Sequence, residues 1–236
     1  MERYVWKDRE LGTMILNVRV TARHFIFRIK DGGIMITVPP FAKIHDISKV
    51  IDSNRLKLQM MLQTAKAHKY VFDEGDIIVT HDFIVVFNYL PSSQIVYRLQ
   101  DKCLYIGCPS KFEMTSPDVQ NIMISGLKKF VKRSAEAYLP SRLKELSASL
   151  NLRYNKASIT FGRKRLGSCD ARKNIKLSYY LMFLPDHLID YVIYHELAHL
   201  TEMNHGESFH YLCNRYCNGR EQELRKELRE YRFPID

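Results

Sequence analysis

The sequence contains no hydrophobic run long enough to cross a bilayer. One of its longest apolar stretches, Phe83-Ile84-Val85-Val86-Phe87, is far shorter than the roughly 20 residues that a membrane-spanning helix requires. The first eight residues are charged and lack the apolar segment of a signal peptide. We therefore expect a soluble, cytoplasmic protein that does not interact with membranes.

Cysteine is too scarce for a disulfide framework. The chain has 236 residues and five cysteines, and an odd number in a chain large enough for a hydrophobic core argues against such a framework. Cys213 and Cys217 lie four apart in a predicted helix, but no matching pair lies elsewhere at zinc-finger spacing. We interpret both as buried free thiols.

The sequence also lacks low-complexity segments, an evident internal repeat and the glycine-rich phosphate loop of the Walker type. Alternating apolar residues and turn signals predict strands at 14–18, 24–29, 34–38, 77–80, 83–87, 94–99 and 103–106. A hairpin turn is expected at 31–33, and helical spacing covers 44–67. This part, residues 1–112, is predicted to be a β-rich region with one helix.

Helical and strand patterns alternate in the remainder of the chain, residues 113–236. A helix should begin at Pro117, be interrupted at Pro140 and continue to residue 150. The following patterns predict strands at 158–161, 166–169 and 175–183, then helices at 185–202, 207–217 and 220–231. The predicted fold class is α+β.

Positive charge exceeds negative charge, and the excess is uneven. The formal net charge is +10. Eight basic residues gather before residue 185 with only Asp170 opposing them: Arg153, Lys156, Arg163, Lys164, Arg165, Arg172, Lys173 and Lys176. This cluster indicates an anionic substrate, a nucleic-acid surface or ordinary solvated charge, and Arg172 and Lys173 are expected to affect substrate binding. Charges of the last helix alternate in sign, which is typical of a solvated face.

The most informative pattern is His195-Glu196-Leu197-Ala198-His199. An apolar run at 188–194 precedes it and predicts a buried helix. Residues four apart lie on one face of a helix, so His195 and His199 can offer nitrogens to one ion. Glu196 can then reach a water molecule held by that ion, which is the H-E-x-x-H arrangement of zinc hydrolases.

A third metal ligand is predicted at His205. Asn204 and Gly206 flank it, and both residue types tolerate the positive φ that ends a helix. Three protein ligands leave a position open for water, as in catalytic zinc sites, whereas four ligands close a structural site. We therefore predict Zn²⁺ bound by His195, His199 and His205, since imidazole suits this ion.

These residues and their surroundings resemble the YgjP-like metal-dependent hydrolases, which are similar to SprT-like zincin metallopeptidases. The likeness is densest between Arg163 and Phe209 and rests on 167–169, 174–177, 191–200, 204–205 and 209. It implies a zincin-like catalytic domain over 113–236, three histidine ligands and a glutamate base. His210 stands where the family usually has tryptophan, so we interpret it as a packing residue.

The predicted function is zinc-dependent hydrolysis of a peptide or protein. Glu196 would take a proton from the attacking water and pass it to the leaving group, while the 167–169 strand pairs with an extended substrate. Cys169 is expected to be a small packing residue, with a metal-binding thiolate as the alternative. Two other functions remain open: a metal-dependent nucleoside triphosphate pyrophosphatase, whose phosphates the basic cluster would bind, and a nucleic-acid-associated zinc protein.

Overall fold

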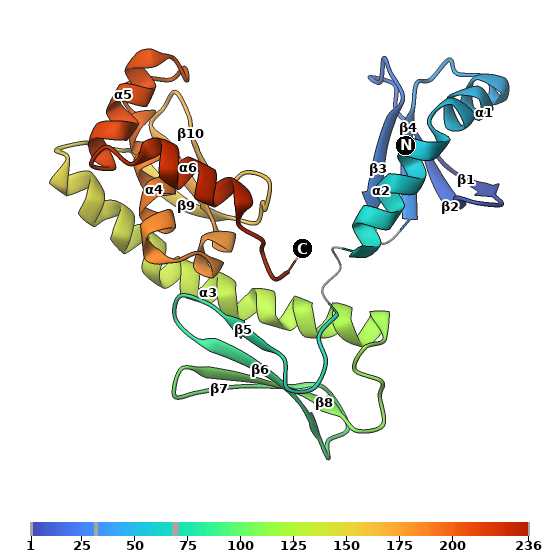
Figure 1. The fold of residues 1–236 in the computed structure, drawn as a ribbon, viewed down its shortest axis with the longest axis horizontal. Coiled ribbons are helices and arrows are strands. Elements are labelled where there is room, and N and C mark those ends of the chain that lie inside the picture. Colours follow the sequence, from blue (N-terminus) through green and yellow to red (C-terminus); the bar gives the residue numbers. More distant parts are fainter. Residues whose placement is uncertain (1, 31–32, 68–70, 236) are drawn as a thin grey trace. The chain divides into compact units, whose positions relative to one another are not determined.

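The computed structural model describes residues 2–30, 33–67 and 71–235, and its chain divides into two compact units, Met1–Tyr70 and Val71–Asp236 (Figure 1). The expected boundary between residues 112 and 113 falls inside the second unit. The reason is that strands before this point and helices after it share one hydrophobic core.

The N-terminal unit is a four-stranded sheet covered by two helices. Its strands are β1 (Glu2–Asp8), β2 (Gly12–Val18), β3 (Ile26–Lys30) and β4 (Gly33–Val38). Their order is β1-β2-β4-β3, with β2 and β4 parallel and the outer pairs antiparallel. The β3–β4 hairpin is as predicted, although residues 31–32 of its turn lie outside the described residues. Strand β1 was not predicted.

Two helices replace the single helix predicted at 44–67. They are α1 (Ile44–Ser53) and α2 (Arg55–Ala67). Asn54 separates them because its backbone leaves the helical conformation, at φ −112° and ψ 11°. Its side-chain Nδ2 also donates to the carbonyl oxygen of Val50 at 2.8 Å, which stabilises the end of α1. Arg55, at the start of α2, forms two 3.0 Å contacts with the carboxylate of Asp8.

A second four-stranded sheet opens the C-terminal unit. Its strands are β5 (Ile77–Val79), β6 (Ile84–Leu90), β7 (Val96–Gln100) and β8 (Cys103–Pro109). Their order is β5-β6-β8-β7, and again the central pair is parallel while the outer pairs are antiparallel. All four were predicted within a few residues.

The two sheets repeat one topology, which corrects the interpretation that the chain has no internal repeat. Strand order and pairing sense are the same in both. Related residues lie seventy positions apart, Arg28 with Arg98 and Pro39 with Pro109. Few residues are identical between the two sheets, so the sequence alone does not show the repeat.

One long helix, α3 (Pro117–Ser149), packs on the second sheet and runs beneath the C-terminal helices (Figure 1). Pro117 occupies its first turn, as predicted, whereas the side chain of Ser116, which was expected to cap the helix, forms no capping hydrogen bond. The helix continues through Pro140, contrary to the predicted interruption. Leu139 and Leu143 are fully buried on either side of Pro140, so core packing offsets the one hydrogen bond that proline cannot make.

The segment after α3 forms a small sheet and then the C-terminal helices. Its strands, ordered β10-β11-β9, are β9 (Lys156–Thr160), β10 (Gly167–Cys169) and β11 (Asn174–Ser178). The strand predicted to reach residue 183 ends at Ser178, whose hydroxyl accepts from the Tyr180 amide and starts a 3₁₀ helix, η1 (Tyr179–Phe183). Helices α4 (Asp186–Ala198), α5 (Glu207–Tyr216) and α6 (Glu221–Glu230) follow.

The architecture is α+β, as predicted, with its sheets mainly in the first half and its helices in the second. Among the helices of the described residues, none combines the length and apolar character needed to cross a membrane.

Candidate metal centre

Helix α4 is fixed in the core by its own apolar residues. Leu188, Ile189 and Ile193 are fully buried and hold one face of the helix in the main hydrophobic cluster. A bidentate ion pair adds a second anchor, since the guanidinium of Arg142 on α3 lies 2.6–2.7 Å from the carboxylate of Asp190. The last turn of α4, with His195 and Glu196, is therefore held on a rigid element.

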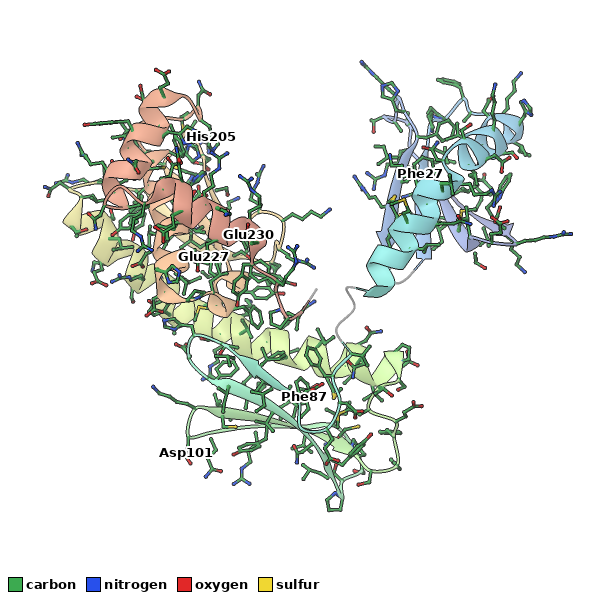
Figure 2. The ribbon with its side chains drawn as sticks, viewed as in Figure 1. Phe27, Phe87, Asp101, His205, Glu227 and Glu230 are labelled. Carbon is green, nitrogen blue, oxygen red and sulfur yellow. The ribbon has the colours of Figure 1, made fainter. Side chains whose placement is uncertain are left out.

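Three histidines converge at the end of α4. One ring nitrogen each from His195, His199 and His205 lies within 4.8 Å of the others. The helix ends at Ala198, and the chain returns through a turn so that Nε2 of His205 lies 3.1 Å from Nε2 of His195. Figure 2 shows His205 near α5 in the C-terminal unit. The structure thus brings together the three residues that the sequence singled out.

A phenylalanine supports the three imidazoles. The ring of Phe209, the third residue of α5, is fully buried and has its centroid 4.5–4.8 Å from those of the three histidines. A rigid aromatic ring beneath them limits their side-chain freedom, which reduces the entropy lost when they bind a common ion.

Two of these histidines, His195 and His199, are held in the neutral form that a metal ligand requires. Burial, with the nearby His199 and His205, lowers the pKa of His195 to about 4. Burial also lowers the pKa of His199. Its Nδ1 lies 3.0 Å from the carbonyl oxygen of Glu202, and since a carbonyl only accepts, Nδ1 carries the proton and Nε2 presents its lone pair. This donor set fits a divalent ion that prefers nitrogen ligands, such as zinc.

The side chain of Glu196 extends from α4 to strand β10, where it lies against Gly167. The side chain is buried, with 4 % of its surface exposed, and its Oε2 has no hydrogen-bond partner among the described residues. Burial raises the pKa of Glu196 to about 8, against the opposing effect of Arg165. A buried carboxyl without a partner is costly, so this group is placed at the expense of stability, as functional groups often are.

Gly167 makes room for this carboxyl. A Cβ atom at Gly167 would lie 2.5 Å from Oε1 of Glu196, well inside van der Waals contact. Only glycine allows strand β10 to approach α4 this closely. The sequence showed the Gly-Ser-Cys stretch through its resemblance to the family, but not why its first position needs glycine.

A cavity of about 340 Å³ opens beside His195 and Glu196. Four basic side chains line it: Lys164 and Arg165 from the loop before β10, and Arg225 and Arg229 from α6. Arg172 and Lys173 of the sequence cluster do not line it. The two α6 arginines are exposed, as the predicted solvated face requires, and their i, i+4 spacing places them side by side on one surface.

Two other side chains considered from the sequence lie apart from the histidine cluster. Nδ1 of His210 pairs with Oε1 of Glu221 at 2.6 Å. Burial, with Glu196 nearby, raises the pKa of the Cys169 thiol to about 11, which disfavours the thiolate that a metal would need. All five cysteines are free, and Cys213 and Cys217 are buried, as predicted.

Comparison with known proteins identifies the family. A sequence model of the YgjP-like metallopeptidase domain matches residues 23–231. The chain belongs to the YgjP-like family. Its membership makes it a metallohydrolase, and the histidine cluster lies within the matched YgjP-like region. A search of curated proteins returned no match.

Two solved structures are similar to part of this YgjP-like chain. The metallopeptidase zymogen abylysin of Pyrococcus abyssi is 19 % identical, with a TM-score of 0.35, over 38 % of this chain and 90 % of the other. The metallopeptidase zymogen jannalysin of Methanocaldococcus jannaschii is 24 % identical, with a TM-score of 0.32, over 38 % and 96 %. TM-scores this low support no conclusion about function.

Proposed function

We propose that this protein is a zinc-dependent metallopeptidase in which His195, His199 and His205 bind the ion and Glu196 is the general base. One observation carries the proposal: three imidazoles converge beside a buried carboxyl that has no hydrogen-bond partner among the described residues. Three nitrogen ligands leave a coordination position open, as in catalytic zinc sites.

Each protein group has a distinct task in this proposal. A bound zinc ion would supply Lewis acidity, which lowers the pKa of water and polarises a carbonyl group. Glu196 accepts a proton from the attacking water and donates it to the leaving amine. Its buried position excludes competing solvent from the carboxyl, and Gly167 sets the depth at which this carboxyl lies. Phe209 keeps the three imidazoles in place.

Strand β10 offers a site for an extended substrate. It pairs with β11 on one side only, so its other edge is available for backbone hydrogen bonding. Since β10 packs against α4, a peptide added to this edge would run past Glu196. Tyr191 also lines the cavity, and burial raises the pKa of its hydroxyl, which therefore remains protonated and able to donate a hydrogen bond.

A second candidate function is hydrolysis of a nucleoside triphosphate, and the cationic cavity is the observation that favours it. Arginine and lysine side chains bind phosphate strongly, and four of them line the cavity beside Glu196. The same base could activate water for attack on phosphorus. Of the two reactions, peptide hydrolysis has additional support, because the family model that matches this chain describes a metallopeptidase domain.

The two functions are separated by assaying zinc-loaded protein on a peptide panel and a nucleoside triphosphate panel side by side. Protein stripped with a chelator serves as the control for contaminating enzymes. We expect peptide cleavage that is lost with the metal and restored by zinc. Metal-dependent release of pyrophosphate with no peptide cleavage would replace the peptidase proposal with the second function.

A further inference from the structure

The cavity beside Glu196 holds an unusual excess of positive charge. Lys164, Arg165, Arg225 and Arg229 line it, and among the described residues no carboxylate forms an ion pair with any of them. Other arginines of the same unit are paired, for example Arg142 with Asp190 at 2.6 Å. Four unpaired cations in one concave site repel one another unless an anion joins them.

The four side chains come from two elements that are distant in sequence. Lys164 and Arg165 lie in the loop that leads into β10, whereas Arg225 and Arg229 lie one turn apart on α6. Helix α6 packs against α4 through Leu224, which is buried, so Arg225 and Arg229 stand beside the packed face. All four side chains are exposed to solvent, and the fold brings the two pairs together on the lining of the cavity that Glu196 also lines.

The surroundings of the loop reinforce the positive potential. A second cavity, of about 580 Å³, includes Arg163 of the same loop and Lys128, Lys129 and Lys132 of α3. None of the described residues that line this second cavity is acidic, although Glu136 pairs with Lys132 at 3.3 Å. Low-dielectric walls with one sign of charge focus the electric field and attract a ligand of opposite charge.

We infer that the cavity lined by Lys164, Arg165, Arg225 and Arg229 is an anion-binding subsite, so that the substrate carries a carboxylate or phosphate group directly beside the bond that is cleaved. This inference rests on the proposed hydrolytic function, because it places the anion next to Glu196. A peptidase with such a subsite would select acidic or phosphorylated segments and discriminate against their neutral counterparts.

Binding to the full-length Glu196→Gln protein tests the subsite without turnover. Three fluorescein-labelled peptides of one sequence are compared, with glutamate, phosphoserine or glutamine at a central position. We expect the two anionic peptides to bind about tenfold more tightly than the glutamine peptide, and their binding to weaken as sodium chloride concentration rises. Equal affinity for all three would overturn the inference.

Paired charge removals locate the effect. The double variant with Arg225→Gln and Arg229→Gln on α6 should lose the preference for the anionic peptides. A second double variant, with Lys164→Gln and Arg165→Gln in the loop before β10, should lose it as well. The matched control is Arg172→Gln with Lys173→Gln, which removes two charges from an exposed turn outside the cavity. Equal losses in all three variants would show a general field of the basic surface and contradict a specific subsite.

Hydrolysis assays on the wild-type protein distinguish failure of the subsite from failure of the proposed peptidase. Cleavage of peptides without any acidic preference would retain the peptidase and overturn the subsite. Conversely, anionic probes that bind through Arg225 and Arg229, with no peptide cleaved, would support the subsite and overturn the peptidase. A nucleoside triphosphate added to the same assay shows whether phosphate is the anion that is hydrolysed.

Discussion

Replacing Gly167 with alanine should disable the base without removing the metal. The new Cβ would lie 2.5 Å from Oε1 of Glu196, 2.7 Å from its Cγ and 2.8 Å from its Cδ. Ordinary contacts start at 3.4 Å, so the carboxyl must move by about 1 Å, and a displacement of this size can cost about 100-fold in rate. We expect turnover to fall by this factor.

The same substitution should have a modest effect on stability. The φ angle of Gly167 is not in the left-handed region, so alanine adds no backbone strain there. Overpacking against a buried side chain costs about 1–3 kcal/mol, which urea unfolding measures. The zinc content, measured by mass spectrometry, should match that of the wild-type protein.

Gly162→Ala is the matched control, since it adds the same methyl group to the neighbouring loop. The nearest atom to its Cβ is the backbone oxygen of Arg165 at 3.4 Å, and Glu196 is not among the contacts. This variant should keep nearly full activity. Wild-type turnover in Gly167→Ala would refute the view that the position of the Glu196 carboxyl limits the rate, and metal loss would show that β10 supports the ligands instead.

Three further predictions concern the metal ligands, the ring that supports them and the N-terminal unit. His205→Ala should lose most of its zinc while His210→Ala retains it, because His210 pairs with a carboxylate away from the cluster; metal analysis showing the reverse would move the third ligand. Phe209→Ala should lower the free energy of unfolding by about 3–5 kcal/mol and weaken zinc binding in a chelator competition, and wild-type zinc affinity would show that the ring does not position the imidazoles. Hydrogen bonds from Arg55 and from the backbone amide of Leu11 hold the pKa of Asp8 well below its ordinary value, so this carboxylate should stabilise the N-terminal unit fully above about pH 5 and lose its contribution only as the pH falls well below about 4, through the lowered pKa of the folded state. Asp8→Asn should thus destabilise that unit at pH 7 and still at pH 3, with the difference shrinking only in stronger acid, as followed by fluorescence of the single tryptophan in β1; a difference already lost at about pH 4 would contradict the ion pair.

The parts of the structure that the sequence predicted well depend on local patterns. Helix α4 and the spacing of His195, Glu196 and His199 follow from helical periodicity. His205 lies close to them as predicted, but not for the predicted reason, since neither Asn204 nor Gly206 adopts a positive φ and Gly206 caps α5 at φ −85°. The strands of the second sheet were predicted because turn residues separate short alternating segments.

The features that the sequence missed depend on tertiary contacts. Pro140 does not interrupt α3 because the leucines beside it are buried in the shared core, a gain that local propensity does not include. Strand β1 pairs along its whole length with β2, which its charged sequence does not reveal. Arg225 and Arg229 are exposed, in agreement with the predicted solvated face, but the packing of α6 against α4 also places them on the lining of the cavity beside Glu196, which the sequence does not reveal.

The central claim is that three histidines hold the metal while Glu196 acts as the base. Its most direct test is the rate of peptide hydrolysis measured together with zinc content on one preparation of Glu196→Gln. We predict one zinc ion per chain, as in the wild-type protein, and hydrolysis reduced by at least about 100-fold, since general-base catalysis contributes on this order. A variant that purifies without zinc, or one that carries zinc and still hydrolyses peptides at the wild-type rate, would contradict the account.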